Sequence, residues 1–116
     1  IEIITNHIIT VLPLVPDYVK GIINLRGQII PIIDIRLRMG NPSIDYTNST
    51  CIIVLNINSV QIGIIVDDVQ QVMDIDQSQI SPVPVENRQE LISGMVSSSD
   101  RSVILFLDCE QLLQTY

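Results

Sequence analysis

Two aspartates, Asp34 and Asp108, have the residue type and placement that suit acid–base chemistry. Each follows an apolar run, and the two hold equivalent places in an internal repeat described below. Paired carboxylates can act as general acid and general base. Each aspartate also precedes a short amphipathic turn, where aspartate is a favoured helix N-cap, and neither is followed by Thr-Gly or Ser-Gly. The sequence therefore favours two caps, with a small acid-dependent hydrolase as the alternative.

Metal and cofactor chemistry has few candidate residues in this chain. His7 is the only histidine, and Cys51 lies far from Cys109, which makes a poor zinc site. Asp67 and Asp68 would point to opposite faces of a strand, so they do not form a cation site. Phosphate-binding loops and nucleophile elbows are absent. We predict no cofactor and no metal, with two free thiols in a reducing, cytoplasmic compartment. A disulfide between the two cysteines is the alternative.

Arg26 is the candidate for recognition. It lies with Gly27 and Gln28 in a short polar segment between two β-branched runs, residues 22–23 and 29–33. Short β-branched runs predict buried strands, and Gly27 supplies the positive φ that a hairpin turn often needs. The turn lifts one guanidinium out of an apolar segment. Because a guanidinium donates several hydrogen bonds in a fixed fork, it suits an interface hot spot. The alternative is a turn arginine in solvent.

The charge of the chain is acidic and unevenly spread. Its 116 residues carry a net charge of −7, which argues against nucleic acid as a partner because phosphate binding requires a basic face. Residues 1–40 hold 4 basic and 3 acidic side chains (+1), and residues 41–116 hold 2 basic and 10 acidic ones (−8). This asymmetry suits a partner that presents both signs. No apolar run approaches the ~20 residues of a membrane helix, and no signal peptide is visible, so no membrane insertion is expected.

The composition favours an all-β fold. Ile and Val are abundant, while there is one Phe and no Trp, so branched aliphatics must fill the core. The patterns predict strands at residues 1–4, 8–12, 22–23, 29–33, 51–57, 61–66, 94–96 and 103–107. Short helical turns are expected after Asp34 and after Asp108. The length suits one domain, or two small lobes that share a core.

An internal repeat organises these elements. Its copies share a glycine, an arginine and an aspartate, which are Gly21, Arg26 and Asp34 in one copy and Gly94, Arg101 and Asp108 in the other. We predict one domain over residues 1–116, with a first lobe at about 1–44 and a second at about 45–113. The strand pair at 51–66 introduces the second copy, whereas nothing precedes the first, so the first lobe is expected to lack N-terminal strands. A homodimer formed by strand swapping is one way to cover the open edges.

The segment from Pro16 to Arg36 resembles the signature of CheW-like domains. Later blocks at residues 63–69, 80–84 and 107–113 are similar to the same family. The resemblance implies two intertwined, five-stranded SH3-like β-barrels and a non-enzymatic adaptor role in chemotaxis. It further implies two partners, the regulatory domain of a CheA histidine kinase and the cytoplasmic tip of methyl-accepting chemoreceptors.

The resemblance also implies partner-binding residues, each by its position in the motif. Arg26 matches an arginine implicated in partner contacts, Gly21 matches the turn glycine of the motif, and Glu2 matches an acidic residue at a strand end. The apolar residues that fall near the receptor groove are Cys51, Val69 and Val72. Each of these three also has a core interpretation.

The protein context of this CheW-like domain has two interpretations. The chain is a stand-alone adaptor, or it is the CheW-like regulatory domain of a larger CheA kinase or of a CheV-type protein. An ATPase domain or a receiver domain in the same gene would select the second interpretation.

Overall fold

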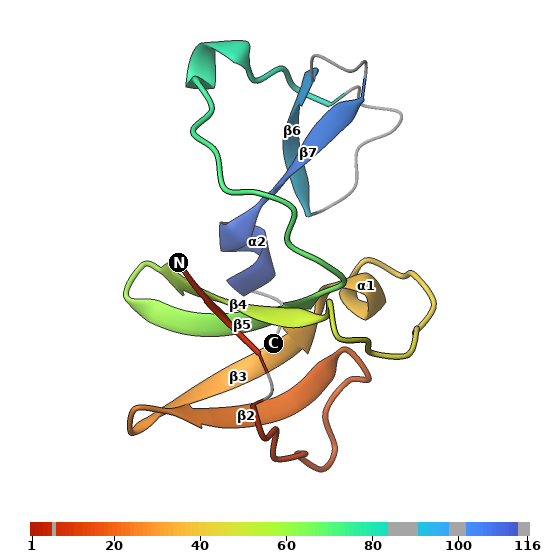
Figure 1. Ribbon diagram of the computed structural model, residues 1–116, viewed down its shortest axis with the longest axis vertical. Helices are drawn as coiled ribbons and strands as arrows, with labels where there is room; N and C mark the ends of the chain where they lie inside the picture. Colours follow the sequence, from red (N-terminus) through yellow and green to blue (C-terminus); the bar gives the residue numbers. More distant parts are fainter. Residues whose placement is uncertain (6, 84–90, 98–101, 114–116) are drawn as a thin grey trace. The chain divides into compact units, whose positions relative to one another are not determined.

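The structure is a computed structural model that describes residues 1–5, 7–83, 91–97 and 102–113. Strands dominate it, and they are β1 (Glu2–Ile4), β2 (Val19–Leu25), β3 (Gln28–Asp34), β4 (Cys51–Ile57), β5 (Val60–Val66), β6 (Ile92–Ser97) and β7 (Val103–Leu107). The helices are short, α1 (Ile35–Arg38) and α2 (Cys109–Leu113), with one 3₁₀ turn at Gln77–Gln79. The prediction of an all-β fold with short helical turns after two aspartates is confirmed (Figure 1).

The chain divides into two compact units, Ile1–Gln71 and Val72–Tyr116. The lobe boundary expected from the sequence, near residue 44, lies earlier in the chain than this division. The difference lies in the hairpin of β4 and β5, which continues the sheet of the first unit. Its β5 pairs in parallel with β3, with Ile64 opposite Ile33. Parallel pairing joins segments that are distant in the chain, so it leaves no local signal in the sequence.

The first unit holds a five-stranded sheet in the order β1-β4-β5-β3-β2. Two hairpins build it, β2 with β3 and β4 with β5. The second hairpin turns through Asn58 and Ser59, whose φ angles are 51° and 68°. Positive φ at both central residues defines a type I′ turn, which matches the twist of the flanking strands. Both predicted hairpins are confirmed.

The N-terminal segment reaches both edges of this sheet. Its β1 pairs with β4 at one edge, and further along the same segment Thr10 bridges Ile22 of β2 at the other edge (Figure 1). Thr10 and Ile22 exchange two backbone hydrogen bonds of 2.8 and 2.9 Å. The expected strand at residues 8–12 is reduced to this single bridge. Bringing the two edges together gives the sheet the closure that small barrels need.

The core of the first unit is aliphatic. Its buried members come from β2 to β5, and residues of the N-terminal segment pack against them. They are Ile23, Leu25, Ile30, Ile32, Ile52, Val54 and Ile65, with Ile4 and Ile9 partly buried beside them. The β-branched side chains that predicted buried strands therefore form the core, as expected.

The second unit repeats the local plan of the first. Its β6 and β7 form a hairpin, and Ser81 bridges Met95 of β6 as Thr10 bridges Ile22 of β2. The connection between the strands predicted at residues 94–96 and 103–107 falls mainly on residues 98–101, which lie outside the described residues.

Both hairpins also carry a bulge at the repeated glycine. The register shifts between Val19 and Gly21 in β2 and between Ile92 and Gly94 in β6. A bulge places an extra residue in one strand and bends it locally. The shared bulge supports the internal repeat that the sequence indicates.

The two repeated aspartates are helix N-caps. The Asp34 carboxylate accepts hydrogen bonds from the backbone amides of Arg36 at 3.0 Å and Leu37 at 3.4 Å. The Asp108 carboxylate accepts one from the amide of Gln111 at 3.1 Å. These bonds satisfy amides that the first turn of a helix leaves without partners. The capping interpretation is confirmed.

Candidate docking site

Arg26 occupies the tip of the β2–β3 hairpin. Its φ is 51° and that of Gly27 is 84°, so the two residues form a type I′ turn. The side-chain oxygen of Asn24 accepts a hydrogen bond of 2.9 Å from the Gly27 amide and fixes the turn. The sequence indicated the positive φ at glycine but not at arginine. A non-glycine residue in this region carries local strain, and such residues often lie at functional sites.

The guanidinium of Arg26 pairs with the carboxylate of Glu2, which lies on β1. The η1 nitrogen of the arginine donates to Oε2 at 3.1 Å, and the η2 nitrogen donates to Oε1. Two parallel bonds of this kind fix both side chains in one geometry. β1 and β2 are the outermost strands of the sheet, so this ion pair spans the two edges that the N-terminal segment joins. The structure thus brings together two residues that the sequence analysis predicted separately.

The two members of the ion pair shift each other's pKa, and both side chains remain accessible to solvent. The hydrogen bond from Arg26 lowers the pKa of Glu2, and the hydrogen bond to Glu2 raises the pKa of Arg26. Both groups are therefore charged over the ordinary pH range. The Arg26 side chain is 68% exposed and that of Glu2 is 39% exposed. The pair is a pre-organised surface feature that offers both signs of charge to solvent.

Gly21 lies inside β2 at the bulge, and not in the turn of the motif as the resemblance implied. Its φ is 144°, and a Cβ added there would sit 2.1 Å from the carbonyl oxygen of Thr10. Only glycine allows the N-terminal segment to approach β2 this closely. Gly21 therefore supports the site indirectly, because the segment it admits carries Glu2.

The three predicted apolar contacts lie in different environments. Cys51 begins β4 and is 7% exposed, so its core interpretation holds. Burial, followed by the charge of Asp68, raises the pKa of the Cys51 thiol. Val69 is half-buried after β5. Val72 belongs to the second unit and is 84% exposed, so its core interpretation is wrong. Val72 lies in the stretch between β5 and the 3₁₀ turn at Gln77–Gln79, where the chain forms no regular element.

Asp34 is buried, with 3% of its surface exposed. Besides the two amides of its cap, it accepts a hydrogen bond of 2.7 Å from the hydroxyl of Tyr46. Burial and this hydrogen bond raise the pKa of Tyr46. A buried carboxylate that accepts hydrogen bonds from three donors is well suited to hold the loop of Tyr46 against α1. Sequence reasoning found the cap but missed Tyr46, for which the chain carries no local signal.

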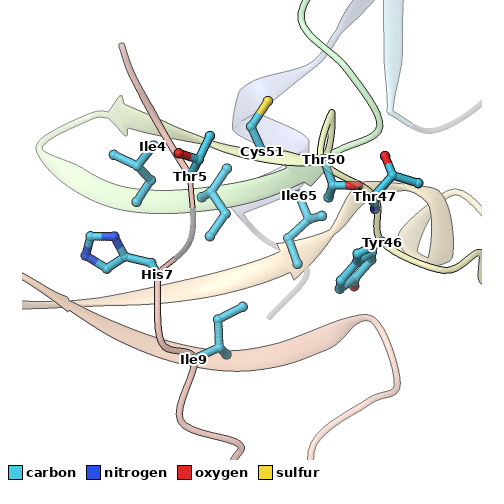
Figure 2. A pocket seen from close by; sticks show the side chains of 10 residues that line it. Ile4, Thr5, His7, Ile9, Tyr46, Thr47, Thr50, Cys51 and Ile65 are labelled. Carbon is cyan, nitrogen blue, oxygen red and sulfur yellow. Dashed lines mark hydrogen bonds between the residues drawn. The ribbon is translucent and has the colours of Figure 1, made fainter.

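A pocket of about 160 Å³ opens beside this loop (Figure 2). One side is formed by the N-terminal segment and the other by the residues that lead into β4, with Ile52 and Ile65 from the core. The lining side chains are Ile4, Thr5, His7, Ile9, Tyr46, Thr47, Thr50, Cys51, Ile52 and Ile65. Figure 2 shows Ile9 and Tyr46 on opposite sides of the hollow. Its apolar base and polar rim suit a binding site in the mouth of a barrel.

The described residues hold no group of three or more histidine, cysteine or acidic side chains that could bind a metal ion. Cys51 and Cys109 are both free thiols. No described helix is long and apolar enough to cross a membrane.

A small sheet closed by its own N-terminal segment, with an accessible ion pair at the seam, defines a β-barrel module of the SH3-like type. The chain belongs to the CheW-like domain family, whose model matches residues 1–116. The resemblance stated from the sequence is thereby confirmed.

Several relatives carry the CheW name. The chemotaxis protein CheW of Klebsiella aerogenes is 39% identical over 103 residues, which cover 86% of this chain and 61% of that protein. CheW of Helicobacter pylori is 31% identical, with 98% of this chain and 70% of that protein covered. The chain thus spans well under the full length of these relatives. The chemotaxis protein CheV3 of Helicobacter pylori is 28% identical, and the match covers 33% of it.

A solved structure shares the fold. The scaffolding protein TtCheW from Thermoanaerobacter tengcongensis superposes with a TM-score of 0.84 at 33% identity, covering 91% of this chain and 73% of that one.

Proposed function

We propose that the chain is a non-enzymatic cytoplasmic adaptor that couples a CheA-type histidine kinase to methyl-accepting chemoreceptors. The observation that carries this proposal is the match to the CheW-like family over residues 1–116. The chain then works by docking to the kinase regulatory domain and to the cytoplasmic receptor tip. The capping role of Asp34 and Asp108 leaves the hydrolase alternative without a supporting observation.

The ion pair of Arg26 and Glu2 is the proposed contact for the kinase domain. Its exposure leaves the outer face of the guanidinium free for an acidic group of the partner. Because Glu2 already holds the guanidinium in one geometry, binding loses less side-chain entropy than it would with a mobile arginine. Gly21 supports this contact by admitting the segment that carries Glu2.

The proposed contacts for the receptor tip are the apolar positions Cys51, Val69 and Val72. Val72 offers an exposed side chain, whereas Cys51 is buried and would act by shaping the surface around it. A conserved-volume replacement, Val72→Thr, keeps its shape and adds a hydroxyl, and we expect it to weaken receptor binding.

A CheW-like domain of a larger kinase or of a CheV-type protein is the second candidate, and the match to CheV3 supports it. The complete gene decides between the two. The proposed homodimer by strand swapping is tested separately, since light scattering that gives a strictly monomeric mass would exclude it.

Calorimetric titration with an isolated CheA regulatory domain tests the main proposal. We expect Arg26→Ala to weaken binding and Arg26→Asp to weaken it at least about tenfold, as for an interface hot spot. Lys20→Ala is the matched control because it removes one positive charge from the same β2–β3 hairpin, away from its tip. Equal binding by Arg26→Asp and the unchanged protein would return Arg26 to a turn arginine in solvent.

An exchange variant separates docking from a purely internal role of the pair. Glu2→Arg combined with Arg26→Glu rebuilds the ion pair with its charges exchanged. If the pair only joins the sheet edges, the double variant restores kinase binding. If a partner reads the guanidinium at the hairpin tip, as proposed, binding stays weak although the fold recovers.

A further inference from the structure

We propose that the N-terminal cleft, defined as the hollow between residues 4–5 and 7–11 on one side and residues 43–51 on the other, binds an extended segment of a partner protein with alternating aliphatic side chains. This site goes beyond the proposed adaptor contacts, since it lies within the first unit and involves neither Arg26 nor Glu2, and Cys51 is the one proposed receptor contact among the residues that line it. The inference rests on three observations, which are the continuity of the hollow, its free backbone edge and the size of its deepest part.

The cleft is continuous along the N-terminal segment. The pocket of about 160 Å³ ends at Ile9 and Tyr46, and a shallower hollow of about 390 Å³ begins at the same two residues. The shallower hollow runs on past Val11 and Ile44. The exposed fractions of these two side chains are 79% and 43%. The cleft therefore has an elongated, apolar character that suits a chain segment better than a compact ligand.

The backbone edge of the cleft selects the conformation of its occupant. The backbone amide and carbonyl of Thr10 both form hydrogen bonds with Ile22. Because these groups alternate sides along an extended chain, those of Ile9 and Val11 face away from β2. Among the described residues, none forms a hydrogen bond with the backbone of Ile9 or Val11. An added strand can pair with such an edge, whereas a helix has no free backbone groups to offer.

The deep pocket selects the side chains of the occupant. Its volume of about 160 Å³ is close to that of a cavity that accommodates a benzene-sized group, ~150 Å³. One leucine or phenylalanine side chain fits such a space. Every second side chain of an extended segment faces the same way, about 7 Å apart. The next inward side chain would then reach the shallower hollow, where Val11 and Ile44 offer apolar contacts beside the charged side chains of Lys20 and Asp45.

The test uses the capped peptide SVTLTVS, labelled with a fluorophore, and the complete 116-residue chain. Anisotropy measures the dissociation constant. A second peptide with N-methyl groups on alternate amides keeps the side chains and loses the donors. We expect the unmodified peptide to bind and the methylated peptide to bind at least tenfold more weakly. Absence of binding at millimolar peptide, or equal binding of both peptides, overturns the proposal.

Variants of the protein locate the site. Val11→Pro removes the proposed backbone donor while leaving the two bonds of Thr10, and it keeps Thr10 extended. Val11→Ala keeps the donor and serves as its matched control. Thr5→Phe fills the pocket from an exposed position and provides a second test if the proline variant unfolds. Ile29→Lys, 61% exposed on β3, is the remote control.

The proposal expects tenfold weaker binding for Val11→Pro and for Thr5→Phe, with Val11→Ala and Ile29→Lys close to the unchanged protein. Unchanged binding by both Val11→Pro and Thr5→Phe overturns it. So does preferential binding of a stapled helix carrying the same aliphatic residues. A dimer that Val11→Pro converts to monomer would identify a second copy of the chain as the occupant and would also overturn it.

Discussion

Replacing Gly21 with alanine tests how the N-terminal segment is held on the sheet. The new Cβ would lie 2.1 Å from the backbone oxygen of Thr10 and 2.8 Å from its carbonyl carbon. The backbone cannot yield locally in the way a side chain can. The segment must therefore move away from β2, and the φ of 144° at this position is strained for any L side chain.

The expected cost combines two effects. Backbone strain of this type costs about 1–3 kcal/mol. Displacing Thr10 also breaks its two hydrogen bonds with Ile22, which contribute about 0.5–1.5 kcal/mol each. The sum is about 2–6 kcal/mol, which is a large fraction of the about 5–15 kcal/mol that stabilises a typical domain.

Two other glycines serve as graded controls. Gly27 has a φ of 84° with nothing within 4 Å of an added Cβ, so Gly27→Ala costs only the backbone strain of about 1–2 kcal/mol. At Gly94 the nearest atom is the Cγ2 methyl of Ile80, at 2.8 Å, which can shift. Urea unfolding followed by circular dichroism should rank Gly21→Ala as the least stable of the three. If Gly21→Ala is no less stable than Gly27→Ala, the steric argument is wrong.

Three further predictions concern the same unit. In an NMR titration, Glu2 should show a pKa below its ordinary value, and Arg26→Ala should raise that pKa again. Because the pKa of Glu2 is lower in the folded state, the ion pair stabilises the fold above the unfolded-state pKa, and this stabilisation is lost as pH falls through the folded-state pKa. Arg26→Ala should therefore make the stability of the chain depend less on pH in the acid range. Tyr46→Phe removes the hydroxyl donor to buried Asp34 and should destabilise the chain by about 1–2 kcal/mol in urea, whereas no change would show that the bond is not formed. Cys51 should react with iodoacetamide more slowly than a cysteine peptide and speed up in denaturant, because burial raises the pKa of its thiol; equal rates measured by mass spectrometry would contradict its burial.

Local features of the fold could be predicted because their causes are local. The type I′ turn at Gly27 lies between two β-branched runs, and the turn at Asn58 and Ser59 separates two more. The caps at Asp34 and Asp108 follow from an aspartate before a short amphipathic segment. In each case the residues that decide the structure are within a few positions of one another.

Distant pairings could not be predicted in this way. β5 enters the sheet beside β3, although periodicity only shows that both are buried strands. Proline residues after position 12 and the approach at Gly21 limit the expected strand at residues 8–12 to one bridge. Val72 has the residue type of a core position and is nevertheless exposed, because residue type fixes burial only on average.

The candidate site shows the same division between local and distant causes. A turn arginine was evident from the sequence, but its partner Glu2 lies 24 positions away, and only the bent N-terminal segment brings the two together. The Arg26–Glu2 pair therefore depends on the position of the N-terminal segment, whereas the position of the segment does not depend on the pair. A change at Gly21 that displaces the segment should also release Arg26 from Glu2, whereas a change at Arg26 leaves the Thr10 bridge and the core in place. We therefore expect variants of Gly21 to lose both stability and kinase binding, and variants of Arg26 to lose binding while the fold persists.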